Sequence, residues 1–144
     1  MKRNLMMMIA VLWAATLMAQ PLSVEEKVFF DQQMSNQAKS WNMGDVDGFM
    51  SYYWGSDSLL FVTGGQVRRG WQNIRDSYEK KYPGPEAMGT LEYSHLYFYK
   101  IDKKTVFCTG SWALVISGER KDGTFTLIWK KIKNRWVITM DHTE

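Results

Sequence analysis

Residues 41–82, WNMGDVDGFMSYYWGSDSLLFVTGGQVRRGWQNIRDSYEKKY, carry the signals that decide the fold. Glycine readily adopts the left-handed conformation that ends many helices, so Gly44 is expected to stop a helix that begins upstream. That beginning is marked by Ser23, which opens an S-x-x-E capping box. Asp45 can then cap a second helix through Tyr53. The sequence therefore predicts a long helix followed directly by a short one.

A hairpin and a third helix follow in the same stretch. Residues 58–63 and 66–69 have strand-like composition, and the Gly64-Gly65 pair between them suits a tight turn. Apolar side chains then recur at helical spacing over residues 71–82, and a Pro-Gly-Pro sequence ends that pattern.

Four longer strand patterns fill the rest of the chain, at residues 90–101, 105–117, 123–133 and 135–142. Short polar segments join them, and one of the turns is expected at residues 119–122. This order of elements predicts an α+β domain in which a curved mixed or antiparallel sheet wraps around three helices of the amino-terminal half. A pocket is expected between the sheet and the helices.

Residues 1–19 have the features of a signal peptide, which leaves one domain at residues 20–144. Lys2 and Arg3 form a basic start, an uncharged apolar run follows, and Ala19 offers a cleavage position. The run is short for a permanent span, which needs about 20 apolar residues. We therefore expect a periplasmic or secreted protein with no membrane span after the leader is removed.

The charge balance of the chain argues against nucleic-acid binding. The leader holds two of the 18 basic residues and none of the 15 acidic ones, so the remaining chain has a net charge of 16 − 15 = +1. Such a balance gives no electrostatic basis for binding nucleic acid. The pairs Arg68-Arg69, Lys80-Lys81 and Lys130-Lys131 are interpreted as solvated surface. Arg69 could also neutralise an anionic ligand near the third helix, although a surface salt bridge is favoured.

The cysteine and histidine content argues against disulfide, nucleophilic and metal chemistry. Cys108 is the only cysteine, so no intrachain disulfide can form, and its apolar strand setting favours a packing role. His95 and His142 lie far apart in the sequence and do not form an H-x-x-x-H motif. The Gly64-Gly65 pair is too short to cradle a phosphate. No metal or cofactor is therefore expected.

The element order, together with a set of residues, resembles the NTF2-like (cystatin-like cone) superfamily, and more narrowly its exported SnoaL-like or DUF4440 branch. The resemblance spans residues 24–143 and is carried by Trp41-Asn42-Met43-Gly44-Asp45, Phe49, Tyr53-Trp54, Asp57-Ser58-Leu59, Val67, Arg69-Gly70-Trp71, Tyr78, Tyr82-Pro83, Trp136-Val137-Ile138 and Asp141-His142-Thr143. It implies a cone-shaped fold that hosts isomerases, dehydratases, epoxide hydrolases, polyketide cyclases and non-enzymatic binders. Steroid-isomerase relatives place their two acidic groups near positions 62 and 128, where this chain has valine and isoleucine, so that chemistry is not predicted.

His142 and Asp57 are the candidate catalytic pair. By strand alternation, His142 shares a face with Trp136, Ile138 and Met140, where an imidazole among apolar groups can act as a base. Asp57 could orient it or bind a polar ligand, although a turn carboxylate is the favoured interpretation. Asp141 lies on the opposite strand face, so it is not expected to act with His142 as a dyad.

Aromatic residues supply the expected walls of the pocket. Trp54, Tyr78 and Trp112, together with Asp57 and His142, are the predicted ligand-binding residues. An alternating set on one strand, Leu91, Tyr93, His95, Tyr97 and Tyr99, could line the concave wall, although packing or a dimer interface is favoured.

The sequence thus favours binding of a small apolar or aromatic molecule by a homodimer that associates through the open sheet face. An isomerase, dehydratase or hydrolase that uses His142 with Asp57 is the first alternative. A structural or protein-interaction module is the second.

Overall fold

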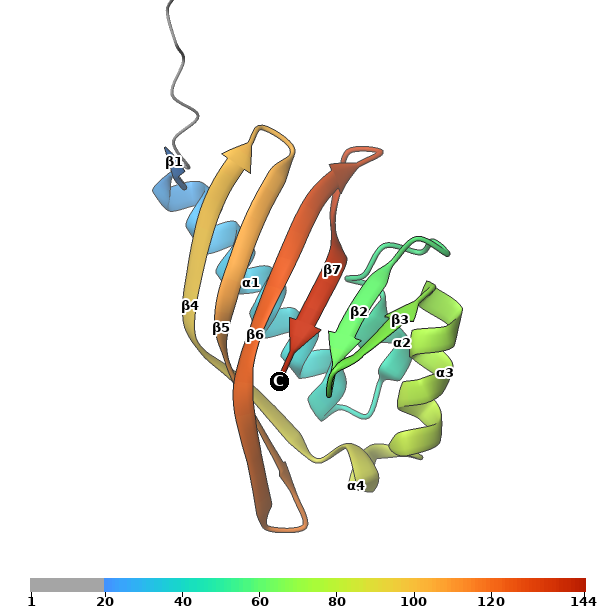
Figure 1. Ribbon diagram of the computed structural model, residues 1–144. Helices are drawn as coiled ribbons and strands as arrows, with labels where there is room; N and C mark the ends of the chain where they lie inside the picture. The colour runs from blue at the N-terminus through green and yellow to red at the C-terminus, as the bar shows by residue number, and fades with distance from the viewer. Residues whose placement is uncertain (1–19) are drawn as a thin grey trace, which may run out of the picture.

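The computed structural model of the protein describes residues 20–144 (Figure 1). Its helices are α1 (Val24–Asn42), α2 (Val46–Met50), α3 (Trp71–Lys81) and α4 (Pro85–Met88). Its strands are β1 (Gln20–Pro21), β2 (Leu60–Thr63), β3 (Gln66–Arg69), β4 (Thr90–Asp102), β5 (Thr105–Ile116), β6 (Glu119–Ile132) and β7 (Arg135–Thr143). The expected order of helices and strands is confirmed, and the short elements β1 and α4 are additions that the sequence did not predict.

The strands form one curved sheet in the order β1-β4-β5-β6-β7-β2-β3. The pairing of β2 with β7 is parallel, whereas the other neighbouring pairs are antiparallel. In Figure 1, α1 lies across one face of the long strands, α3 lies beside β2 and β3, and α4 lies below α3 near the start of β4. This arrangement is the predicted mixed sheet wrapped around helices.

The junction between α1 and α2 forms as the sequence predicts. Ser23 and Glu26 make both hydrogen bonds of the capping box at the start of α1. Gly44 has φ +75°, and a Cβ there would lie 2.4 Å from Pro85 Cγ, so a side chain is excluded both by conformation and by space. The Asp45 carboxylate accepts a 2.8 Å hydrogen bond from the Gly48 N–H and caps α2.

Two boundaries differ from the prediction in ways that affect the pocket. α2 ends at Met50, and Ser51 and Tyr52 form a turn before Tyr53 makes a parallel bridge with Ile138. The turn between β5 and β6 is not at residues 119–122: Ser117 and Gly118, both with positive φ, make a two-residue turn, and β6 already begins at Glu119. The longer hairpin brings Lys121 into the sheet.

A β-bulge in β4 corrects the predicted aromatic stripe. The pairing with β5 jumps from Ser94 to Tyr97, and His95, within the irregular segment, has φ +51°. An inserted residue reverses the side-chain alternation beyond it. Leu91 and Tyr93 therefore face inward, whereas Tyr97 and Tyr99 are exposed, and the five residues do not share one face.

Aromatic packing fills the end of the sheet where α1 begins. The Phe30 ring lies 5.7 Å from Phe98, 5.6 Å from Trp129 and 5.1 Å from Trp136, measured between ring centroids. Phe30 and Trp129 are almost fully buried. These rings fill the space between α1 and the sheet at this end. Within residues 20–144, none of the helices has the length and apolar character needed to cross a membrane.

Candidate functional site

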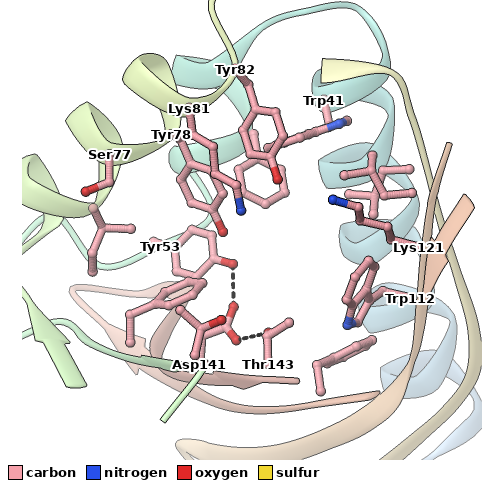
Figure 2. A pocket seen from close by; sticks show the side chains of 18 of the residues that line it. Trp41, Tyr53, Ser77, Tyr78, Lys81, Tyr82, Trp112, Lys121, Asp141 and Thr143 are labelled. Carbon is pink, nitrogen blue, oxygen red and sulfur yellow. Dashed lines mark hydrogen bonds between the residues drawn. The ribbon is translucent and has the colours of Figure 1, made fainter. Parts of the chain in front are cut away.

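A cavity of about 700 Å³ lies between the sheet and the helices at the end of the cone formed by α3 and α4 (Figure 2). Its lining is mainly aromatic and aliphatic, contributed by Met34, Trp41, Phe49, Tyr53, Phe61, Ile74, Tyr78, Tyr82, Ala87, Leu91, Tyr93, Trp112, Leu114, Ile116, Phe125 and Leu127. A smaller polar and charged set completes the lining: Thr63, Gly64, Gln66, Arg68, Ser77, Lys81, Lys121, Asp141 and Thr143. The predicted hollow is therefore present.

Asp141 is the one acidic side chain in this lining. It is 4% exposed, and its carboxylate accepts a 2.7 Å hydrogen bond from the Tyr53 hydroxyl and a 2.5 Å hydrogen bond from the Thr143 hydroxyl. Figure 2 shows both bonds at the floor of the pocket. Each carboxylate oxygen thus has one protein donor, and the group is fixed in orientation.

Burial raises the pKa of Asp141 from 3.8 to about 6, because the charged form loses its hydration. The hydrogen bonds from Thr143 and Tyr53 and the nearby His142 act in the opposite direction and limit the rise. The same burial, together with the charge of Asp141, raises the pKa of the Tyr53 hydroxyl, which therefore remains a hydrogen-bond donor. A carboxyl group in this range can both take up and release a proton near neutral pH.

A β-bulge in β7 directs the Asp141 side chain into the cone. The strand face that the sequence analysis assigned to His142 is therefore wrong. β6 residue Ile128 pairs with Met140, whereas the next residue, Trp129, pairs with Ile138, so Thr139 is the extra residue. The Thr139 hydroxyl donates a 3.2 Å hydrogen bond to the Ile128 carbonyl. Alternation is reversed beyond this point, and His142 does not share the buried face of Ile138.

The strands on both sides of β7 confirm this orientation. Asp141 pairs with Phe61 on β2 and with Leu127 on β6, and all three line the cavity. His142 pairs with Val62 and Thr126, and these three residues are absent from the lining. The His142 side chain is 41% exposed, and its Nε2 lies 3.2 Å from the Glu144 carboxylate.

Of the five predicted ligand-binding residues, Tyr78 and Trp112 line the cavity. Trp54, Asp57 and His142 do not. Trp54 is half-buried outside the cavity, and Asp57 is exposed in the loop before β2. Among the described residues, no hydrogen bond joins Asp57 to His142, so the structure does not bring the proposed catalytic pair together.

Tyr53 reaches Asp141 because the segment after α2 is bound to β7. The Trp54 N–H donates to the Ile138 carbonyl at 2.9 Å, and the Ile138 N–H donates to the Tyr52 carbonyl at 2.9 Å. Sequence reasoning missed the pair of Tyr53 and Asp141, since it assigned Tyr53 to a helix and Asp141 to the outer face. The available signal was Asp141 itself, since aspartate is uncommon within strands.

The structure also places the residues that were considered for metal binding, nucleophilic catalysis and acid–base chemistry of the steroid-isomerase kind. Across the described residues, no group of three or more His, Cys, Asp or Glu side chains is arranged to bind a metal ion. Cys108 is fully buried, and burial raises the pKa of its thiol, which opposes formation of the nucleophilic thiolate. Positions 62 and 128 also lie outside the cavity lining.

Comparison with solved structures identifies the family. The chain is similar to a crystal structure of an NTF2-like protein of unknown function from Shewanella oneidensis MR-1, with 33% identity, coverage of 82% of this chain and 98% of that one, and a TM-score of 0.79. This chain belongs to the NTF2-like superfamily. Its curved sheet and amino-terminal helices are the fold of that superfamily, as the sequence predicted.

More distant structures share the fold. A protein of unknown function with a cystatin-like fold from Nostoc punctiforme is 11% identical, with a TM-score of 0.68 over 87% of this chain and 94% of that one. An NTF2-like superfamily protein from Salmonella enterica is 17% identical, with a TM-score of 0.65 over 82% of this chain and 89% of that one. No protein-family model matches the chain, and no curated protein sequence matches it.

Proposed function

We propose that this NTF2-like protein binds a small, mainly apolar or aromatic molecule inside the cone. The observation that carries the proposal is the cavity of about 700 Å³, which lies within the range of ~300–1,000 Å³ typical of small-molecule sites. Its walls are mainly aromatic and aliphatic with a smaller set of polar groups, which is the usual composition of a ligand pocket. An interaction module would need no such hollow.

A thermal-shift screen of the chain without residues 1–19 tests this proposal, followed by native mass spectrometry of the protein with each hit. We expect apolar aromatic compounds to raise the melting temperature, because a ligand that binds only the folded state stabilises it. Ala87→Trp, which places an indole in the cavity, should abolish these shifts. Val67→Trp adds the same ring at an exposed position of β3 outside the cavity lining and should preserve them. An absence of shifts across a broad library would contradict binding.

A second candidate is an enzyme in which Asp141 acts as general acid and base. The specific observation is a buried carboxyl group with a pKa raised to about 6 that receives hydrogen bonds from Tyr53 and Thr143. In an isomerisation, the carboxylate would remove a proton from carbon beside a carbonyl group, and the resulting acid would return that proton elsewhere on the same molecule. Asp141 takes the role that sequence reasoning gave to His142 and Asp57.

Turnover of any compound found in the screen tests this candidate. Asp141→Asn should retain binding and lose the reaction, since an amide cannot exchange the proton. Thr143→Val removes one hydrogen bond and should lower the rate less. Full turnover by Asp141→Asn would exclude the acid–base role.

Export and the narrower family assignment are also proposed. The signal-like features of residues 1–19, which lie outside the described residues, support export, and the sequence motifs around Trp41 and Trp71 support the SnoaL-like or DUF4440 branch. Amino-terminal sequencing of the periplasmic or secreted protein tests export, and we expect it to begin at Gln20. Recovery of the uncleaved chain in the cytoplasm would contradict the proposal.

We propose in addition that the protein forms a homodimer through the outer face of the sheet. Tyr97, Tyr99 and Ile101 are exposed on β4, and Val115 is exposed on β5. Light scattering of the purified protein should give twice the monomer mass, and Tyr97→Asp should give the monomer mass. A wild-type monomer at micromolar concentration would contradict the proposal.

A further inference from the structure

Three basic side chains, from three different elements, line the cavity: Arg68 on β3, Lys81 on α3 and Lys121 on β6. Each of them is exposed, whereas Asp141 and Tyr53 are buried. The cations therefore lie toward the mouth and the carboxyl group lies deep. Figure 2 shows the ammonium groups of Lys81 and Lys121 directed into the pocket from opposite sides, with the Tyr82 hydroxyl between them.

The local structure fixes these orientations. Arg68 pairs with Phe61 across the β2–β3 hairpin, and Lys121 pairs with Leu114 across the β5–β6 hairpin, so each shares the face of a cavity-lining residue. Lys81 follows Ile74 and Tyr78 at spacings of seven and three residues, which places all three on one face of α3.

Each of these cations has a basic neighbour in the sequence that does not line the cavity: Arg69, Lys80 and Arg120 respectively. The sequence interpretation treated the first two pairs as uniform solvated surface and considered Arg69 for a ligand anion. The structure separates the members of each pair, and Arg68 is the arginine at the pocket.

Within residues 20–144, the pocket cations also have no salt-bridge partner. Among the described residues, salt bridges involve Lys27, Arg75, Lys100, Arg120 and His142, but none involves Arg68, Lys81 or Lys121. The one acidic group in the lining is the buried Asp141. Three converging, uncompensated positive charges at the mouth of an apolar cavity attract an anion and lower its desolvation cost there.

We propose that the ligand is an organic anion whose apolar body occupies the cone and whose acidic group binds Arg68, Lys81 and Lys121 at the mouth. The inference rests on the proposed small-molecule function and specifies its ligand class. The opposite orientation would bring two acidic groups together at Asp141. Bound this way, the ligand presents its uncharged end to Asp141 and the Tyr53 hydroxyl.

Two fluorescent probes that differ by one charged group test the proposal. 8-Anilinonaphthalene-1-sulfonate is an anion, and N-phenyl-1-naphthylamine is its uncharged counterpart without the sulfonate. We expect the wild-type protein to bind the anion about tenfold more tightly than the neutral probe, because three exposed ion pairs together contribute an effect of this size. Added salt should weaken binding of the anion and leave the neutral probe unchanged.

Charge-matched triple variants locate the effect. R68Q/K81Q/K121Q should bind the anion about tenfold more weakly and the neutral probe with unchanged affinity, which also demonstrates that the variant is folded. R69Q/K80Q/R120Q changes the net charge by the same amount and should bind both probes as the wild-type protein does. Displacement of the bound anion by 2-naphthoate, and not by 2-naphthamide, would extend the result to carboxylates.

The outcomes separate this inference from the proposed function. Equal affinity of the wild-type protein for the two probes, or equal losses in the two triple variants, would overturn the anion site while leaving the pocket intact. Failure of the wild-type protein to bind either probe would overturn the proposed function together with the inference.

Discussion

At one end of the cone the space between the sheet and the helices is filled by aromatic rings, and at the other end similar rings surround a hollow. At the filled end, Phe30 packs against the rings of Phe29, Phe98, Trp129 and Trp136 with centroid separations of 5.1–5.7 Å. At the hollow end, the Phe61 ring contacts Tyr53 and Tyr78 at 6.1 and 6.0 Å and also borders the cavity. Aromatic content alone does not distinguish a core from a binding site.

Two buried polar groups, one at each end, differ in their hydrogen bonding. At the filled end, the buried indole N–H of Trp129 has no hydrogen-bond partner among the described residues. At the hollow end, the buried Asp141 has two donors. Dense packing can leave a buried polar group without a hydrogen-bond partner, which lowers the stability of the fold. A carboxyl group that has two donors and borders a cavity is positioned to interact with a bound molecule.

Substitution of one phenylalanine at each end should give the largest difference in stability. Phe30→Ala is expected to lower the free energy of unfolding by about 3–5 kcal/mol, because it opens a cavity in a closely packed core. Phe61→Ala should cost roughly half as much, since one side of that ring already faces the hollow. Urea denaturation measures both values, and equal losses would mean that the two ends are equally packed.

Asp141→Asn should stabilise the protein at neutral pH. A folded-state pKa raised from 3.8 to about 6 means that the contribution of Asp141 to stability is fully present below about pH 4 and is lost as pH rises through 6. Asparagine carries no charge, so this loss does not occur in the variant. Its free energy of unfolding should exceed that of the wild-type protein by up to about 3 kcal/mol above pH 7 and by little at pH 4.

We assign this pH dependence to the carboxyl group of Asp141. The neighbours that influence its titration, or are influenced by it, are Tyr53, Tyr78, Tyr93, Cys108, His142 and Thr143. Measurement of unfolding free energies from pH 4 to pH 8 tests the prediction. A constant offset between wild-type and variant proteins across that range would contradict it.

Tyr53→Phe should have an intermediate effect. It removes the 2.7 Å hydrogen bond that favours the charged form of Asp141, so the pKa of that carboxyl group should rise further above about 6. The stability lost at neutral pH should be about 1–2 kcal/mol. Tyr52→Phe, one position earlier and outside the cavity lining, is the matched control. A titration midpoint unchanged in Tyr53→Phe would show that the bond does not stabilise the carboxylate.

His142→Ala should have the smallest effect. The side chain is 41% exposed and lies on the strand face opposite Asp141, so probe binding should remain unchanged and stability should change by less than about 0.5 kcal/mol. A small rise in the pKa of Asp141 is expected, because the charge of His142 lowers it. Loss of binding in this variant would restore His142 to the site.

Much of the fold followed from local patterns. The capping box at Ser23, the stop at Gly44 and the cap at Asp45 act within a few residues, and each is present in the structure. Of the expected pocket residues, Tyr78 and Trp112 line the cavity. Tyr78 was placed by helical spacing, which continues without interruption through α3.

The errors in the assignment of strand faces share one cause. Strand alternation assigned His142 inward and Asp141 outward, and it placed Tyr97 on the face of Tyr93. Each assignment failed beyond an inserted residue, because one extra residue exchanges the two faces of a strand.

The sequence by itself determined the order of the main elements and the two ends of α1, since these depend on contacts between near neighbours, and its resemblance to known proteins indicated the NTF2-like fold. Tertiary structure alone decided that Asp141 lies inside and that Arg68, Lys81 and Lys121 surround the mouth. The Thr139 hydroxyl donates to the Ile128 carbonyl at the bulge in β7, and Gly110 lies opposite the bulge in β4, where a Cβ would lie 3.0 Å from the Ser94 carbonyl oxygen. These contacts join residues that are distant in the chain, and no local pattern records them.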